Sequence, residues 1–289
     1  MLLRAQWPRM EVRPVSIATS FDYGIGLDVQ VPLIAEAGFT HFSLGASEAH
    51  SDYLNPAGQA HIRTLAQQHG LGIDTIHGPR AEGSDSHDAL SRSVQAAAAL
   101  GVEVVVVHAS PFDFPVAEFE ERLSQVVGVC GALAPVLAAA GVRLALENVL
   151  PGHATDLVER ALEMLDVEWF GFCYDSSHDQ IGGPRPVDLL ARLRHRLIAV
   201  QLSDRTRDFV DHVIPGEGFI QWRDVCGELS LAGYDRPLLL EVSTTHSVVK
   251  EPSRFVRIAQ QQGLQLAQWV AGAESGDLQR VAVGYHPAW

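Results

Sequence analysis

The chain is almost free of lysine. Lys250 is the only lysine among 21 basic residues, which stand against 35 acidic ones, and the net charge of the 289 residues is −14. Because nucleic acid is a polyanion, this charge argues against nonspecific nucleic-acid binding. A local basic rim on an acidic protein would still allow such binding. We therefore do not expect nucleic acid as a partner.

Cysteine and long apolar segments are also scarce. Cys130, Cys173 and Cys226 are odd in number and widely spaced, which predicts reduced thiols in a cytoplasmic protein and no zinc knuckle. The first residues lack the apolar core of a signal peptide. We find no apolar run that approaches the ~20 residues of a membrane span, so we expect no membrane association.

Several common catalytic motifs are missing as well. The chain has no GxGxxG after its first apolar run and no GxxxxGK[ST], CxxC, HExxH or GxSxG. The sequence therefore gives no support to a dinucleotide-binding turn, a phosphate loop, a zincin or a serine hydrolase.

What the chain does have is a regular alternation of short apolar runs and longer helical stretches. The runs predict strands at 15–19, 40–44, 72–76, 103–107, 143–147, 170–174, 197–202 and 237–242. The stretches predict helices at 28–37, 57–69, 86–100, 116–140, 155–165, 186–194, 222–232 and 252–272. Alternation repeated eight times predicts a single-domain α/β protein, a (β/α)8 TIM barrel over about 14–272.

The tail 273–289 falls outside this pattern. It ends in GYHPAW, and two interpretations stay open. Its aromatic residues dock on the barrel or on a second copy of the chain in a homo-oligomer, or the terminus is loosely ordered.

Ionisable and amide side chains stand at or just past the ends of the predicted strands. They are His77, His108, Glu147, Asp175, His178, Gln201, His212 and Glu241. In a barrel, the carboxyl ends of the strands meet at one mouth. Carboxylates gathered there repel one another unless a positive charge lies between them, so the pattern predicts a divalent metal ion at the C-terminal mouth.

The predicted metal ligands are Glu147, Asp175, Gln201 and Glu241. An all-oxygen set favours Mn²⁺ or Mg²⁺ over Zn²⁺ or Co²⁺. The alternatives are that the glutamates form salt bridges to arginines and that Gln201 only bonds a neighbour.

Histidines and arginines complete the expected site. We expect His77, His108, His178 and His212 to contact substrate; a second metal at His77 and His108, or structural histidines there, remain alternatives. The run PGEG at 215–218 predicts a tight loop that carries His212 over the mouth. In that loop Arg205 and Arg207 are the expected contacts of an anionic group, or else solvated surface.

Three segments, LENVL at 146–150, CYDSSHD at 173–179 and the stretch 201–222, together resemble the xylose isomerase-like TIM barrel superfamily. Its members include sugar isomerases and epimerases, inosose dehydratase-like enzymes and endonuclease IV-type apurinic-site nucleases. The resemblance implies one metal held by Glu147, Asp175, Gln201 and Glu241, with the departure that histidine is usual at the position of Gln201.

The nuclease branch implies a cluster of three zinc ions. Most of its ligand positions are filled, by His77, His108, Glu147, Asp175, His178, His212 and Glu241. Two are not, because Gln201 replaces a histidine, and Val210, beside Asp211, replaces an aspartate.

We therefore favour the isomerase and epimerase branch, which implies a sugar or polyol substrate and proton transfer through an enediolate by Glu147 and Glu241. Dehydration shares the same first step. A catalytically inactive carbohydrate-binding barrel is the alternative of another class.

Overall fold

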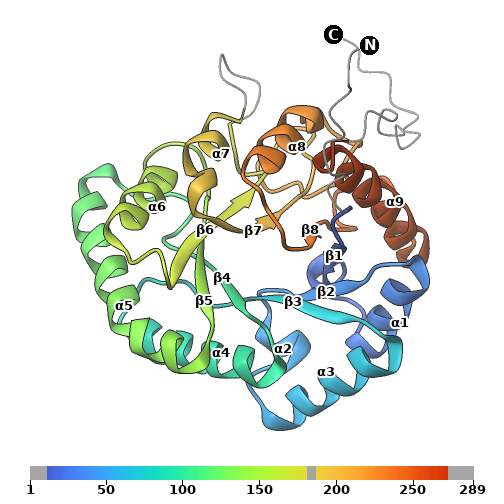
Figure 1. The fold of residues 1–289 in the computed structure, drawn as a ribbon, viewed down its shortest axis with the longest axis horizontal. Coiled ribbons are helices and arrows are strands. Elements are labelled where there is room, and N and C mark those ends of the chain that lie inside the picture. Colours follow the sequence, from blue (N-terminus) through green and yellow to red (C-terminus); the bar gives the residue numbers. More distant parts are fainter. Residues whose placement is uncertain (1–11, 181–186, 273–289) are drawn as a thin grey trace, which may run out of the picture.

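Eight parallel strands form a nearly closed barrel surrounded by helices (Figure 1). This computed structural model describes residues 12–180 and 187–272. The strands are β1 (Val15–Ala18), β2 (His41–Leu44), β3 (Gly72–His77), β4 (Val104–His108), β5 (Arg143–Glu147), β6 (Phe170–Asp175), β7 (Leu197–Gln201) and β8 (Leu238–Leu240). Each lies within one residue or two of a predicted run, so the predicted TIM barrel is confirmed.

The longer helices also lie where the sequence predicts them. They are α1 (Leu27–Ala37), α3 (Pro56–His69), α4 (Ser86–Leu100), α5 (Phe119–Ala140), α6 (His153–Met164), α7 (Asp188–Leu193), α8 (Trp222–Leu231) and α9 (Pro252–Val270). The short elements α2 (Glu48–Ser51) and η1 (Thr19–Phe21) were not predicted. The 3-10 turn η2 (Val116–Glu118) forms the start of the helix predicted at 116–140, and η3 (Arg194–Arg196) begins at the last residue of the helix predicted at 186–194. The tail 273–289 and residue 186 lie outside the described residues.

Glycine ends several of these helices for a conformational reason. Gly38, Gly70, Gly101 and Gly141 follow α1, α3, α4 and α5 with φ between 65° and 94°. This left-handed conformation is strained for other residues, and it lets the chain turn from a helix into the next strand.

The barrel closes at a weak seam. The strand order β7-β6-β5-β4-β3-β2-β1-β8 leaves β7 and β8 as neighbours without a full ladder. Two backbone bonds join them: Leu202 N donates to Leu239 O at 2.8 Å, and Glu241 N donates to Leu202 O at 3.1 Å. The seam therefore lies at two of the predicted metal ligands, because Leu202 follows Gln201 and the second bond starts from Glu241 itself.

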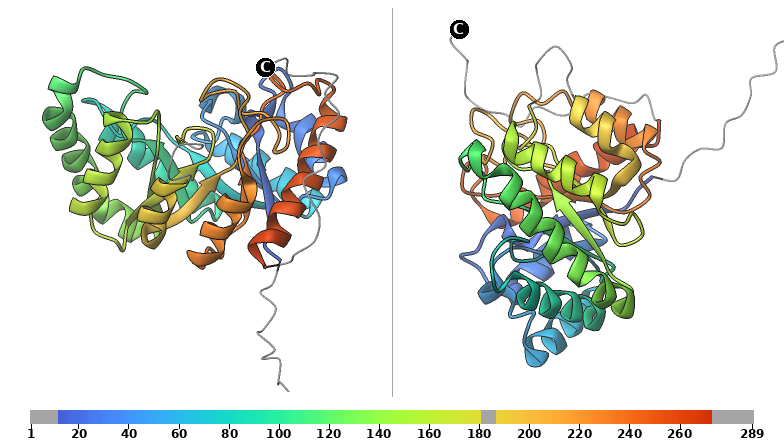
Figure 2. Two further views of the ribbon diagram at one scale, coloured as in Figure 1. Left: turned by 90° about the horizontal axis from the view of Figure 1, so that it is seen from above. Right: turned by 90° about the vertical axis from the view of Figure 1, so that its left-hand side faces the viewer.

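The apolar residues form two separate layers. The larger fills the space between the helices and the outer face of the strands, and the helices surround the strands in all views (Figure 2). The smaller lies inside the barrel and consists of Val104, Val106, Ala145, Cys173, Ile198 and Ala199. Alternation along each strand then places the strand-end residues directly above this inner layer.

Helix α5 corrects one sequence expectation. The segment Val116–Ala140 is long and apolar enough to cross a membrane by length and composition alone. In the fold it is one of the outer helices of the barrel, and Leu123, Val126 and Leu137 on its inner face are fully or almost fully buried. Packing against the strands accounts for this inner apolar face.

Candidate metal centre

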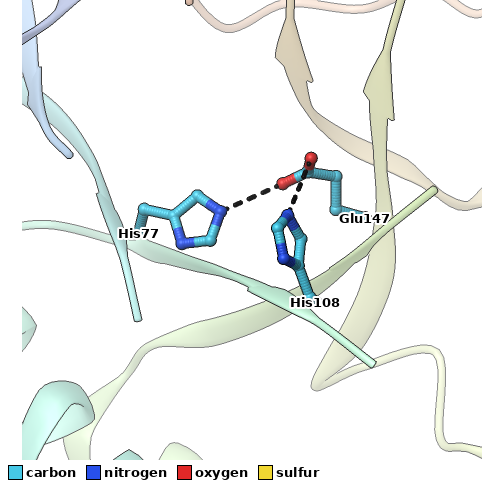
Figure 3. Close-up of side chains that lie close together, drawn as sticks. All are labelled: His77, His108 and Glu147. Atoms are coloured by element: carbon cyan, nitrogen blue, oxygen red, sulfur yellow. Dashed lines mark hydrogen bonds and ion pairs between the residues drawn. The ribbon is translucent and has the colours of Figure 1, made fainter. Parts of the chain in front are cut away.

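Glu147, at the end of β5, is the hub of the mouth. Its side chain is fully buried and lies among three imidazoles. Oε2 is 3.2 Å from Nε2 of His77, and Oε1 is 3.3 Å from Nε2 of His108 and 3.3 Å from Nδ1 of His178. Figure 3 shows His77 and His108 pointing at its two oxygens from β3 and β4. Register explains the contact, because His108 pairs with Glu147 across β4 and β5.

Asp175, at the end of β6, has one oxygen that accepts hydrogen bonds, Oδ1, and one, Oδ2, that lies 3.5 Å from Nδ1 of His178 in an ion pair. Oδ1 accepts hydrogen bonds from Ser177 N (2.7 Å), Ser177 Oγ (2.9 Å) and His178 N (3.0 Å). Oδ2 is buried, and no described residue donates a hydrogen bond to it. A buried carboxylate oxygen without a donor is costly, and a bound cation would remove that cost. This oxygen is the feature of the structure that fits a metal best.

Glu241 follows β8 and completes a group of carboxylates. Its ligand oxygen and those of Glu147 and Asp175 lie within 4.8 Å of one another. Burial, reinforced by the other two carboxylates, raises the pKa of Glu241 well above its usual range. Like charges gathered in a buried place disfavour ionisation, and a cation between them would oppose this effect.

The histidines supply positive charge at the same place. Burial opposes it, but contact with Glu147 raises the pKa of His77 to about 9, and Asp175 and Glu147 raise that of His178 to about 9. Against the effect of burial, His108, His178 and His77 hold the pKa of Glu147 well below its usual range. A divalent ion would take over the role of these protons, because it too stabilises ionised carboxylates.

Gln201, at the end of β7, lies beside Asp175 in the register of β6 and β7 and is buried. Its Oε1 is 3.6 Å from the thiol of Cys173, which donates to it. An amide oxygen has two lone pairs, so one remains for a cation. Its place at the mouth agrees with the predicted ligand set, and ligation itself stays a prediction.

His212 is held over the mouth by a tightly bonded loop. The Asp204 carboxylate accepts from Gly216 N (2.9 Å), Ile220 N (3.1 Å) and Trp222 Nε1 (3.0 Å). His212 itself has φ 45°, a strained value for a non-glycine residue. Its Nδ1 lies 3.1 Å from Ser203 Oγ, and burial lowers its pKa. The loop is therefore a preformed support for one imidazole.

The two arginines of this loop have different places. Arg205 is buried, donates from Nη1 to Ser177 O at 3.1 Å and stacks over Phe209 and Phe219. Arg207 is exposed. The burial of Arg205 favours a role in fixing the loop, and its predicted contact with an anion remains a prediction, as does that of Arg207.

Taken together, the predicted residues form three overlapping groups with ligand spacing. They are His77 with His108 and Glu147; Asp175 with His178 and His212; and Glu147 with Asp175 and Glu241. A sequence model described as the xylose isomerase-like TIM barrel matches residues 31–261. The chain belongs to this family.

Relatives in the xylose isomerase-like family include proteins without an assigned activity. An uncharacterised protein of Sinorhizobium fredii is 26% identical over 286 residues, covering 87% of this chain and 92% of its own. Among solved structures, a D-tagatose 3-epimerase-like protein superposes with a TM-score of 0.74 at 18% identity, covering 91% of this chain and 100% of its own. The IOLI protein with a zinc atom gives 0.71 at 16%, with the same coverage. At these identities the structures show a shared fold.

Sequence reasoning missed several residues that shape this xylose isomerase-like site. Asn148 donates from Nδ2 to Asp175 O at 2.9 Å and accepts at Oδ1 from Asp175 N at 2.8 Å, so it locks the ends of β5 and β6 together. Its place directly after Glu147 in LENVL was the available signal. The Phe112 ring packs edge-on against His108 and His178, with centroids 5.1 and 5.3 Å apart. Nothing in the sequence around Phe112 indicates that contact.

Proposed function

We propose that the protein is a divalent-metal-dependent isomerase or epimerase of a sugar or keto-polyol. The observation that carries the proposal is the group of three carboxylates, the buried Glu147 and Asp175 and the half-buried Glu241, with their ligand oxygens within 4.8 Å. Membership of a family with sugar epimerase-like structures supports it. Mn²⁺ or Mg²⁺ suits an oxygen-rich set, with Zn²⁺ or Co²⁺ as the alternatives.

The proposed chemistry is proton transfer at a carbon beside a carbonyl group. The bound metal would polarise that carbonyl and make the neighbouring C–H bond more acidic. Glu147 and Glu241 come from β5 and from the end of β8, so the two carboxylates approach the centre from different strands. In the proposal one removes the proton and the other returns it. Replacing either glutamate by glutamine should stop its proton transfer, because an amide does not accept a proton.

Two histidines have the right placement to bind substrate hydroxyls. His178 is fixed by Nδ1 contacts to Asn148 O (3.1 Å) and Glu147, while its Nε2 has no hydrogen bond within the described part of the chain. His212 stands across from it, with ring centroids 5.2 Å apart. A substrate hydroxyl between the rings would meet a preformed donor or acceptor on either side.

The test is NMR of candidate ketoses and keto-polyols in D₂O with manganese-loaded protein. Wild type should exchange one carbon-bound proton and form product, whereas Glu147→Gln and Glu241→Gln should lose ~10²–10⁴-fold in turnover. Glu228→Gln is the matched control, since Glu228 pairs with Arg194 on the outside of the barrel. Near-full activity in both glutamate variants would show that these residues are structural.

A second candidate, a zinc-dependent apurinic-site hydrolase, has one observation in its favour. The three ligand groups together contain all seven residues that match the nuclease pattern. Against it, Asp211, the neighbour of the missing aspartate, spends Oδ2 on Thr206 N, Thr206 Oγ1 and Arg207 N inside its own loop. We therefore expect no incision of abasic duplex with Zn²⁺, measured against a true nuclease.

A further inference from the structure

We propose that Cys173 is a positioning residue for Gln201, holding its amide so that the carbonyl oxygen rather than the NH₂ group is turned toward the strand that carries Asp175. This inference rests on the metal centre of the proposed function. It assigns a role to a cysteine that lies in the inner layer of the barrel.

The placement follows from strand register. Cys173 pairs with Glu147 across β5 and β6, while Asp175, two residues later on the same face, pairs with Gln201 across β6 and β7. Cys173 therefore lies beside Glu147 in the register and two residues before Asp175 on the same face of β6. Its sulfur is 3.6 Å from Gln201 Oε1, and both side chains are buried, with 0% and 2% exposure.

The surroundings of Cys173 allow its thiol to set the orientation of the Gln201 amide. Its companions in the inner layer are Val104, Val106, Ala145, Ile198 and Ala199, none of which has a polar side chain. Among these six residues, the thiol is the one side chain that can donate a hydrogen bond. It lies beside the one neutral member of the proposed ligand set.

A group that sets this orientation is needed because the nearby carboxylates favour the NH₂ end of the amide, whereas a metal needs the oxygen. An amide presents two N–H donors at one end and an acceptor oxygen at the other. Next to Glu147, Asp175 and Glu241, the N–H end is electrostatically preferred when no cation is present. A cation requires the oxygen. A hydrogen bond from the thiol stabilises the orientation in which the amide oxygen faces β6. In this orientation Gln201 is ready to bind a metal ion.

The expected effect is modest and specific to metal binding. A hydrogen bond of ordinary strength changes an equilibrium about fivefold. Cys173→Ala should therefore weaken Mn²⁺ binding to the protein about fivefold, equivalent to ~1 kcal/mol at 1.4 kcal/mol per tenfold. Cys173→Ser should bind within about twofold of wild type, because a hydroxyl keeps the donor.

The experiment is titration of the metal-free full chain with Mn²⁺, followed by calorimetry, without substrate. Cys130→Ala is the matched control, since Cys130 is also 0% exposed but lies in α5. It creates a similar cavity and should leave Mn²⁺ affinity unchanged. Cys173→Val is a second variant that fills the space without a donor, and it should behave like Cys173→Ala.

A double-mutant cycle separates positioning from simple structural damage. In a Gln201→Ala background, Cys173→Ala should cause no further loss of Mn²⁺ affinity, because the residue through which it acts is gone. An equal loss in both backgrounds, or no loss in the first, overturns the inference. If the cycle behaves as expected but no ketose is turned over, the proposed function fails and this inference stands. If wild type binds no divalent ion, both are wrong.

Discussion

The two ends of the barrel solve the same electrostatic problem in different ways. At the end of the barrel opposite the mouth, here called the floor, Asp74 of β3 is buried, and the guanidinium of Arg236 lies 3.5 Å from its Oδ1. At the mouth, the ion-pair partners of the buried Glu147 are imidazoles. An arginine is always charged, whereas an imidazole gives up its proton. The floor therefore has a permanent counter-charge, and the mouth has a replaceable one.

A cavity of about 600 Å³ at the floor shows how the permanent arrangement works. Its lining includes acidic and basic residues: Asp74, Glu103, Arg143, Asp235 and Arg236, together with His41. Arg236 also donates to Glu103 Oε2 at 2.7 Å. Burial, only partly offset by Arg236, still raises the pKa of Asp74 to about 6. In line with the proposed function, we expect the floor to serve stability and the mouth to bind an exchangeable cation.

The largest difference between the ends should appear on adding metal. Mn²⁺ at about 1,000 times its dissociation constant should stabilise wild type by ~4 kcal/mol, because it binds only the folded chain. Asp175→Asn at the mouth should lose most of this gain, and Asp74→Asn at the floor should keep it. Urea unfolding with and without Mn²⁺ measures both. Equal gains in the two variants would remove the distinction between the ends.

Removing the floor arginine should give the next largest effect. Arg236→Met leaves Asp74 buried without its counter-charge, which should cost ~3 kcal/mol at pH 8. The folded pKa of Asp74, about 6, lies above its unfolded value. The proton therefore stabilises the folded chain at low pH, and this contribution is lost as pH rises through about 6. The deficit of the variant should shrink at pH 5, as urea unfolding at both pH values would show; a constant deficit would contradict the role given to Asp74.

Changing the neutral ligand at the mouth should give the smallest effect. Gln201→His replaces an amide oxygen by an imidazole, which is a better donor for zinc. Zn²⁺ should gain about tenfold over Mn²⁺, or ~1.4 kcal/mol. Competition between the two ions in wild type and variant is the measurement. An unchanged preference would place Gln201 outside the metal's ligand set.

Much of the fold was predictable because short, mainly apolar strands alternate regularly with longer helices. Strands buried on both faces, such as Val104–His108, show no polar alternation, and glycines such as Gly101 mark the preceding turn. The same logic placed Glu147 and Asp175 at one mouth, since strand ends of a parallel barrel converge. The position of helix α5 was predicted, but its apolar length was underestimated because its apolar composition is spread among small residues.

The finer features of the site depend on contacts that no local pattern carries. The unequal oxygens of Asp175 arise from the turn through Ser177, and the thiol of Cys173 reaches Gln201 only because the register of β6 and β7 shifts between Phe172 and Cys173. A shift of one residue in pairing is a tertiary event. Substrate contacts, the oligomeric state and the cytoplasmic location stay predictions.

The weak seam between β7 and β8 implies that a bound metal would also hold these two strands together. Within residues 12–180 and 187–272, two backbone bonds, Leu202 to Leu239 and Glu241 to Leu202, join the last pair of strands. A cation shared by Gln201 and Glu241 would span that gap as a clasp, linking residues 40 positions apart in the chain. The ring of strands would then be fastened by the same ion that serves the chemistry, and opening of the seam would be coupled to release of the ion.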